Sequence, residues 1–370
     1  MAVIAFPASA FQAAVANGAG RLNAEGASAH LGSFALRAAI VGGAPMVAVA
    51  ALIFIYREAV GQFFGFDGNA VVLWICASLV TAMWLAAHRG TLQGSGQFTA
   101  LGILTLFEIA LRLIASVSLV LGGFGVDGAT AGFPAGVGGA LVYGVWSLRH
   151  RFGRHSNVHV NVWPTVIYES RAVPAMLSVF GAQSTDIVIA NTRLLGAELE
   201  AYSAAALAGR IVFYAGFVVS LIVHPRYRHA FSVQRLQRRF VAVSFGTVAL
   251  ICASGIAVGL LIPHVLHSIL VGSDYTADPQ LMQVYLAASS MLTCALFLTT
   301  IAVAAGWSRV ALALTPIAII QVTGYALIAT TGMDFARILT AAAVLMFIVL
   351  SGSVMMLLWK TARRAHPSPG

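Results

Sequence analysis

The sequence predicts an all-helical protein that crosses a membrane many times. Of its 370 residues, 59% are hydrophobic and only 9% are charged, and the mean hydropathy is +0.90. Soluble domains carry roughly 25% charged residues. Apolar runs long enough to cross a bilayer follow one another through the whole chain, with short connections between them. No stretch remains that could form a soluble domain.

About eleven apolar runs approach or exceed the roughly 20 residues that a membrane-spanning helix needs. The chain begins directly in the first of them, with no basic segment before it, so this run is a poor signal peptide. The predicted spans are 1–17, 32–55, 70–87, 98–121, 126–148, 162–191, 201–224, 240–263, 280–304, 308–330 and 336–359.

Basic residues are concentrated in alternate loops. Arg89, Arg149 and Arg226 lie in one set of loops, whereas Glu58 and Asp278 lie in the other. Cytoplasmic loops of membrane proteins carry the excess of arginine and lysine. The formal net charge of +9 therefore indicates membrane topology rather than nucleic-acid binding. The segments expected in the cytoplasm are 18–31, 88–97, 149–161, 225–239, 305–307 and the C-terminal tail.

A weak internal repeat divides the chain into two halves. The unit that begins at GTLQGSGQF (90–98) resembles the unit that begins at AVAAGWSR (302–309), and each continues as span, turn, span and basic loop. Both units start and end in the predicted cytoplasm, so the halves have the same orientation, as in transporters built from parallel repeats. We predict an N-terminal transmembrane lobe over 1–159 and a C-terminal lobe over 160–370.

Ionisable residues inside the apolar runs are the candidate functional residues, because a charge at membrane depth costs a few kcal/mol or more unless it is paired or hydrated. Glu169, Arg171, Asp186 and Arg210 all lie on the hairpin 160–230. Arg171 and Arg210 are candidate substrate-binding cations, since the guanidinium fork matches phosphate oxygens. Asp186 and Glu169 are candidate cavity carboxylates or ion-coupling groups. The alternative for Asp186 and Arg210 is a structural salt bridge.

Three further ionisable residues lie outside this hairpin. Glu108 and Arg112 are four residues apart, a spacing that puts them on one helix face and predicts an intramembrane pair. Arg37 lies near the cytoplasmic end of its span and is a third candidate substrate cation. Alternatively, its side chain extends to the membrane interface without contacting a substrate.

Several functional classes have no support in the sequence. It contains no Walker A motif, no HExxH and no Ser-His-Asp signature, so we expect no catalytic residue, no metal site and no cofactor. The glycines of GGFGVDGA (122–129) are typical of a tight turn rather than a nucleotide loop. The protein is therefore not expected to be an enzyme.

Three stretches, 89–132, 183–226 and 271–291, resemble the multidrug/oligosaccharidyl-lipid/polysaccharide (MOP) flippase superfamily, and most of all its bacterial polysaccharide and O-antigen flippase branch. In the second stretch an Asp precedes a turn, a Tyr follows it, and a Pro follows the next span. The resemblance implies a MATE-like fold of two six-helix lobes around a cavity. It also implies that the first helix of the family is missing from this chain.

The resemblance implies a flippase that moves an undecaprenyl- or decaprenyl-phosphate-linked saccharide across the bacterial cytoplasmic membrane for surface polysaccharide biosynthesis. The partners expected are the lipid-linked saccharide, anionic lipids, and membrane glycosyltransferases or a polysaccharide polymerase, with no nucleic acid. Two alternatives remain open. One is a cation-coupled multidrug exporter of the MATE type, in which Asp186 serves as the coupling carboxylate. The other is a non-transporting membrane scaffold for cell-wall synthesis.

Overall fold

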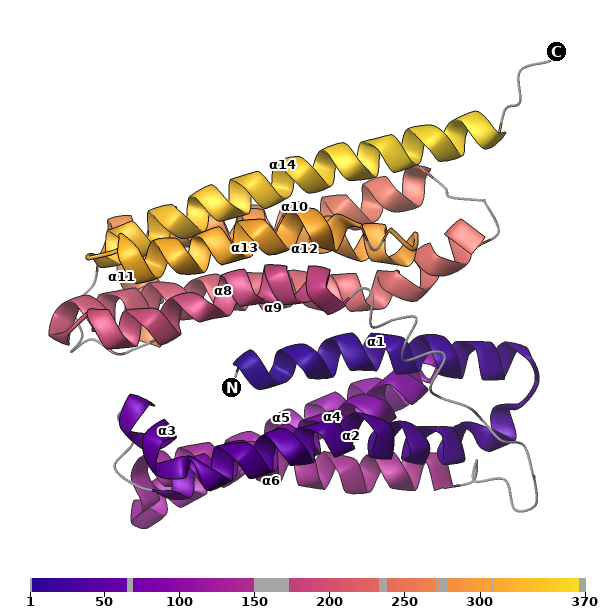
Figure 1. The fold of residues 1–370 in the computed structure, drawn as a ribbon, viewed down its shortest axis with the longest axis horizontal. Coiled ribbons are helices and arrows are strands. Elements are labelled where there is room, and N and C mark those ends of the chain that lie inside the picture. The colour runs from indigo at the N-terminus through magenta and orange to yellow at the C-terminus, as the bar shows by residue number, and fades with distance from the viewer. Residues whose placement is uncertain are drawn as a thin grey trace. The chain divides into compact units, whose positions relative to one another are not determined.

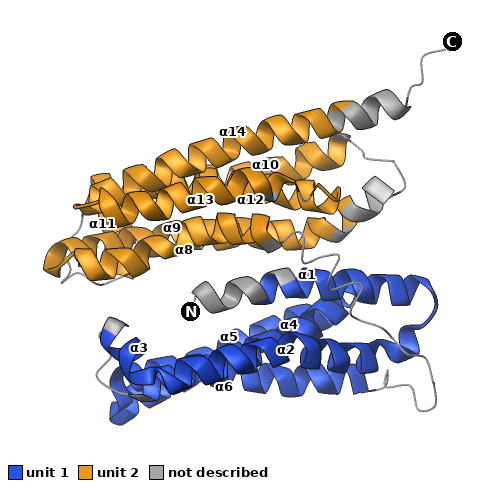
Figure 2. Cartoon of the chain, viewed as in Figure 1, with its two compact units in different colours: residues 1–173 blue, residues 174–370 orange. Residues whose placement is uncertain are grey.

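The structure is a computed structural model that describes residues 2–64, 69–149, 173–232, 238–270, 272, 278–307 and 309–365 (Figure 1). These residues form helices joined by short turns, and no strand occurs among them. The chain divides into two compact units, Met1–Val173 and Pro174–Gly370 (Figure 2). The boundary predicted between 159 and 160 falls in the segment 150–172, outside the described residues.

Unit 1 is organised around α4 (Asn69–Gly94), which packs against the other long helices of the unit. A short helix, α3 (Arg57–Phe64), and a single π-helical turn (Val120–Phe124) interrupt the sequence of spans. The remaining long helices are α1 (Ala2–Ala24), α2 (Leu31–Ile55), α5 (Phe98–Leu119) and α6 (Gly125–Leu148).

Unit 2 is organised around α12 (Pro279–Ala304), which packs against α9 (Gly196–Ser232), α10 (Arg238–Leu261) and α14 (Gly332–Ala365). The carboxylate of Asp278 caps this helix by accepting a hydrogen bond from the backbone N–H of Leu281 at 3.0 Å. The other helices are α8 (Val173–Arg193), α11 (Pro263–Leu270) and α13 (Val310–Leu327).

The two units share a turn at corresponding places in the internal repeat. At the end of α4 the N–H of Gln97 donates to the carbonyl of Leu92 at 2.9 Å, and at the end of α12 the N–H of Trp307 donates to the carbonyl of Ala302 at 2.9 Å. In both turns the residue before the donor is a left-handed glycine, which is the Schellman motif that ends many helices. The same turn also ends α1, where the N–H of Ala27 follows the left-handed Gly26 and donates to the carbonyl of Leu22 at 2.9 Å.

Each predicted span overlaps a helix, and the chain is a polytopic membrane protein. Among the described residues, seven stretches are long and apolar enough to cross a membrane, fewer than the spans expected from the sequence. One of the seven, Phe98–Leu148, contains both α5 and α6, and α13 contributes only a shorter apolar helix. Helices α1 and α8 are not among the seven, although each overlaps a predicted span.

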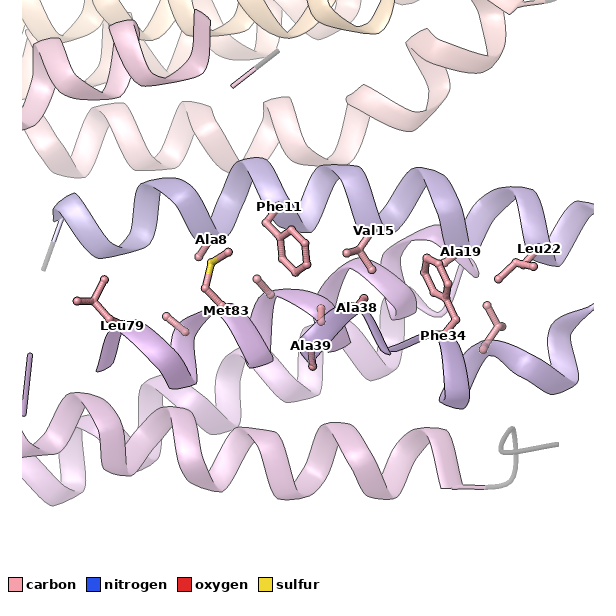
Figure 3. Close-up of a cluster of buried hydrophobic side chains, with 14 residues drawn as sticks. Ala8, Phe11, Val15, Ala19, Leu22, Phe34, Ala38, Ala39, Leu79 and Met83 are labelled. Carbon is pink, nitrogen blue, oxygen red and sulfur yellow. The ribbon is translucent and has the colours of Figure 1, made fainter. Parts of the chain in front are cut away.

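The core of unit 1 joins α1, α2 and α4 through apolar side chains, many of which are alanine (Figure 3). Phe11, Val15 and Ala19 recur at every fourth position of α1 and form one buried face. This face packs against Phe34 of α2 and Met83 of α4, among other residues. Unit 1 therefore has its own buried core, which holds α4 in the position from which Arg89 reaches the neighbouring helix.

Helices α5 and α6 lie unusually close together because α6 presents glycine to α5. A Cβ atom at Gly136 would lie 2.6 Å from the Cβ of Arg112 and 2.7 Å from the carbonyl oxygen of Glu108. A Cβ atom at Gly138, two residues further along the same helix, would meet nothing within 4 Å. The two positions therefore form a matched pair for testing this contact.

We expect Gly136→Ala to destabilise the protein by about 1–3 kcal/mol, since backbone atoms of α5 must move to accept the new methyl group. Gly138→Ala should instead be neutral or stabilising by up to about 1 kcal/mol, because alanine has the higher helix propensity. Thermal unfolding of the purified variants in detergent measures both effects. Equal melting temperatures for the two variants would contradict the close packing of α5 on α6.

Candidate functional site

A fully buried carboxylate, Asp186 of α8, is the centre of a polar cluster in unit 2. Its side chain is 0% exposed. Tyr202 of α9 donates its hydroxyl to Oδ2 of Asp186 at 2.7 Å, and Tyr285 of α12 donates to the same oxygen. Nη2 of Arg210, also on α9, lies 3.4 Å from Oδ1. Donors from two neighbouring helices therefore satisfy both oxygens of this carboxylate.

The sequence of α9 explains how one helix supplies two of these donors. Tyr202 and Arg210 are eight residues apart, a little over two helical turns, so both side chains can reach the same neighbouring helix. The residues between them are mostly alanine, which is small enough for α8 and α12 to approach. Asp186 is the last residue of the polar run Gln183–Asp186, whose side chains interrupt the apolar surface of α8.

A second layer of side chains fixes the two tyrosine rings. The rings of Tyr202 and Tyr285 meet edge to face, with their centroids 5.6 Å apart. The ring of Tyr202 also packs on Phe335 of α14, with a centroid separation of 5.5 Å. Phe335 stacks on Tyr325 of α13 at 5.0 Å. Gln321 donates to the hydroxyl of Tyr325 at 2.7 Å and to the carbonyl of Ala182 at 2.9 Å. The cluster is therefore held by α8, α9, α12, α13 and α14 together.

Arg210 differs from Asp186 in having donors to spare. Its side chain keeps 21% of its surface exposed, whereas that of Asp186 is fully covered. Its Nε atom is buried and has no hydrogen-bond partner among the described residues, and the same holds for Oε1 of Gln183. Because a guanidinium carries five N–H donors, the Asp186–Arg210 pair neutralises the charge without using the full binding capacity of the arginine.

In unit 1 the structure corrects the predicted pair of Glu108 and Arg112. The Glu108 carboxylate is buried and pairs with Arg89 of α4 instead. The guanidinium of Arg112 lies over the ring of Phe133 of α6, 5.1 Å from its centroid. The spacing of four residues does place Glu108 and Arg112 on the same side of α5, but α4 packs beside α5 and brings Arg89 to the carboxylate.

The other predicted site residues have different outcomes. Arg37 lies on α2 with an exposed side chain. Glu169 and Arg171 fall in the segment 150–172, outside the described residues. The structure thus brings Asp186 and Arg210 together, as expected for the salt bridge that was the alternative interpretation. The cluster partners Tyr202, Tyr285 and Tyr325 were not predicted as site residues, because tyrosine in an apolar helix is equally typical of an ordinary core.

Comparisons with known proteins identify the fold. No protein-family model matches the chain, and no curated protein matches its sequence. Among solved structures, the eukaryotic MATE transporter AtDTX14 matches with a TM-score of 0.71 at 13% identity, covering 98% of this chain and 87% of that one. An inward-facing multidrug resistance MATE family transporter of the MOP superfamily matches with a TM-score of 0.71 at 12% identity, covering 100% and 89%.

A third match is a MOP superfamily transporter from Pyrococcus furiosus, whose binding pocket is described as having reverse polarity that suggests a different function. Its TM-score is 0.67 at 14% identity, and the match covers 96% of this chain and 86% of that one. At such identities the likeness establishes the fold alone. The chain has the fold of the MATE transporters, which confirms the predicted fold class.

Proposed function

We propose that this protein is a transporter that moves an anionic amphiphile, a polyprenyl-phosphate-linked saccharide, across the cytoplasmic membrane of a bacterium. The MATE fold supports membrane transport. One observation favours an anionic substrate over a cation. Both buried carboxylates of the described residues are paired with arginine, Glu108 with Arg89 and Asp186 with Arg210.

A cation-coupled exporter needs a carboxylate that can exchange its partner for a proton, a metal ion or a cationic drug. Asp186 is held by two phenol hydroxyls and a guanidinium, so an incoming cation would have to displace Arg210 from a buried pair. Breaking such a pair costs several kcal/mol. Arg210, in contrast, retains a buried Nε donor, and a guanidinium can bind phosphate oxygens in bidentate fashion.

The polarity of the binding pocket is not uniform among proteins of this fold. The Pyrococcus furiosus transporter is described by a pocket of reverse polarity and a suggested difference in function. A pocket that favours an anion is therefore compatible with this architecture. The phosphate group would be bound by arginine while the lipid tail stays in the bilayer. Membrane glycosyltransferases or a polysaccharide polymerase would supply or consume such a substrate.

Reconstitution tests the proposal directly. The full chain is inserted into liposomes of phosphatidylethanolamine and phosphatidylglycerol that contain polyprenyl-diphosphate-linked N-acetylglucosamine. A galactosyltransferase added outside, with radiolabelled UDP-galactose, modifies only the sugars in the outer leaflet. We expect the labelled fraction to rise from about half to nearly all of the lipid, without nucleotide, because the sequence contains no nucleotide-binding loop.

The alternative functions give different results in the same vesicles. Ethidium efflux driven by a sodium or proton gradient, without movement of the saccharide lipid, would replace our proposal with a cation-coupled exporter. Movement of neither compound, by protein that unfolds cooperatively, would instead support a scaffold. Either result would overturn the proposed substrate class.

The charge distribution predicts which loops face the cytoplasm, and single cysteines test this orientation. In a variant whose three native cysteines are replaced by serine, Glu58→Cys should react with an impermeant maleimide in intact cells. Glu25→Cys should react only after the membrane is permeabilised. Both side chains are well exposed, at 79% and 60%. Labelling of Glu25→Cys in intact cells would reverse the assigned orientation.

A further inference from the structure

Arg112 of α5 differs from Arg89 and Arg210 in that the structure gives it no carboxylate. It lies within the apolar stretch Phe98–Leu148 and is half-buried. Within the described part of the chain, its guanidinium contacts the ring of Phe133 and makes no ion pair. We propose that Arg112, together with Arg89 and Phe133, forms a site for the phosphate group of a lipid. This inference rests on the proposed function and adds a second phosphate contact, in unit 1.

The charge of the cluster is the first reason. Arg89 of α4 pairs with Glu108, which lies one turn before Arg112 on α5, so the described part of this cluster holds two guanidinium groups and one carboxylate. An aromatic ring orients a guanidinium through a cation–π contact but does not neutralise it. One positive charge therefore remains uncompensated at membrane depth, where ionisable groups are rare and usually functional.

The unused donors are the second reason. Nε of Arg89 is buried and has no hydrogen-bond partner among the described residues. The face of the Arg112 guanidinium is covered by Phe133, but its N–H groups lie in the plane of the guanidinium and make no hydrogen bond with the residues that the structure describes. Two guanidinium groups with spare donors suit an oxyanion with several acceptor oxygens, and phosphate has this chemistry.

The backbone holds Arg112 in place before any ligand arrives. A Cβ atom at Gly136 would lie 2.9 Å from the Cα of Arg112, and a Cβ atom at Gly132 would lie 2.9 Å from its carbonyl oxygen. This close packing fixes the start of the side chain against α6, and Phe133 fixes its end. A preorganised cation loses less conformational entropy on binding, which favours affinity.

The surface beside Arg112 explains why the anion should belong to a lipid. Leu106, Ile109 and Leu113 are 69%, 49% and 62% exposed, and their spacing places them on one face of α5. Ile109 lies one turn before Arg112. An amphiphile can therefore bind its phosphate at Arg112 while its hydrocarbon tail covers this apolar face. Inorganic phosphate would gain nothing from the apolar face.

Binding of farnesyl phosphate to the full-length protein in detergent tests the site. Farnesol supplies the same tail without phosphate, and inorganic phosphate supplies the anion without the tail. We expect farnesyl phosphate to bind at least about tenfold more tightly than either, since charge-assisted hydrogen bonds and apolar burial both contribute. Arg112→Gln should weaken binding of farnesyl phosphate by about tenfold to hundredfold. Arg112→Lys should fall between, because a lysine keeps the charge and loses the fork.

Arg57→Gln is the matched control. Arg57 also lies 5.1 Å from a phenylalanine ring, that of Phe54, but it stands 3.9 Å from the Glu58 carboxylate. Its replacement should leave binding of farnesyl phosphate unchanged. If Arg112→Gln fails to fold, Phe133→Ala provides a second test, because loss of the ring should weaken binding several-fold.

Three outcomes would overturn the site. The first is equal affinity of the parent protein for farnesyl phosphate and farnesol. The second is equal affinity for farnesyl phosphate and inorganic phosphate, and the third is unchanged affinity for farnesyl phosphate in a folded Arg112→Gln variant.

The binding assay also separates this inference from the proposed function. A protein that binds farnesyl phosphate through Arg112 but does not move the saccharide lipid would keep the site and lose the function. Translocation that is insensitive to Arg112→Gln would keep the function and lose the site.

Discussion

Asp186→Ala should destabilise the protein by about 3–5 kcal/mol, because it removes one partner of a buried ion pair and leaves the other uncompensated. Arg210 would lose its counter-charge, and the hydroxyls of Tyr202 and Tyr285 would lose their acceptor. Asp186→Asn should cost less, because the amide oxygen still accepts hydrogen bonds from the tyrosines. Reversible unfolding of the purified variants in mixed micelles measures these differences.

Asp334→Ala is the control for this prediction. At the start of α14 the N–H of Asp334 donates to the hydroxyl oxygen of Thr331 at 3.2 Å, and the Asp334 carboxylate accepts from the N–H of Thr331 at 3.0 Å. This reciprocal cap typically contributes about 1 kcal/mol. Similar losses for Asp186→Ala and Asp334→Ala would show that the buried cluster contributes no more than one helix cap.

The helices and the intramembrane charges could be predicted from the sequence for the same physical reason. Water is absent at membrane depth, so apolar residues dominate and any charge stands out against them. Asp186, Arg210 and Glu108 were identified in this way. The span predicted over 162–191 overlaps α8, the helix that carries Asp186.

The partners of these charges could not be predicted, since pairing depends on how helices pack. Within one helix, the spacing of four residues favours Arg112 as the partner of Glu108. The partner in the structure is Arg89, which reaches Glu108 from α4. Tyr285 donates to Asp186 from a helix far along the chain. A phenol in an apolar helix carries no sequence signal that distinguishes such a donor from an ordinary core residue.

The internal repeat was only partly predictable from the sequence. Its sequence signal is weak, because the residues that recur are mostly apolar and interchangeable. The turns after α4 and α12 are more specific, since each needs a glycine with a positive φ angle at the same point, Gly96 in one turn and Gly306 in the other. The turn after α1 has the same form at Gly26, and such turns end many helices, so the repeat stays a prediction from the sequence.

Arg210→Ala should reduce translocation of the saccharide lipid by about tenfold to hundredfold, on the expectation that a charge-assisted contact to phosphate is lost. Arg210→Lys should retain part of the activity, because the charge remains and the bidentate geometry does not. The stability of Arg210→Ala should fall less than that of Asp186→Ala, because Tyr202 and Tyr285 still donate to the carboxylate.

The double variant Asp186→Ala with Arg210→Ala separates a binding role from a structural one. Removing both charges leaves no uncompensated ion, so we expect its stability to exceed that of Asp186→Ala alone, a non-additive result typical of residues in direct contact. If Arg210 binds phosphate, translocation by the double variant should stay as low as in Arg210→Ala. Full recovery of translocation would make Arg210 a structural residue and would remove its role in substrate binding.

Arg193→Ala is the matched control for the Arg210 variants. Arg193 lies at the end of α8 and donates to the backbone carbonyls of Ala326 and Ala329 near the end of α13. Its loss should lower stability modestly, by about 1 kcal/mol, and leave translocation at equal protein amounts unchanged. A similar loss of translocation in Arg193→Ala and Arg210→Ala would indicate that arginine substitutions in unit 2 act through the fold, because only Arg210 contacts the buried carboxylate among the residues that the structure describes.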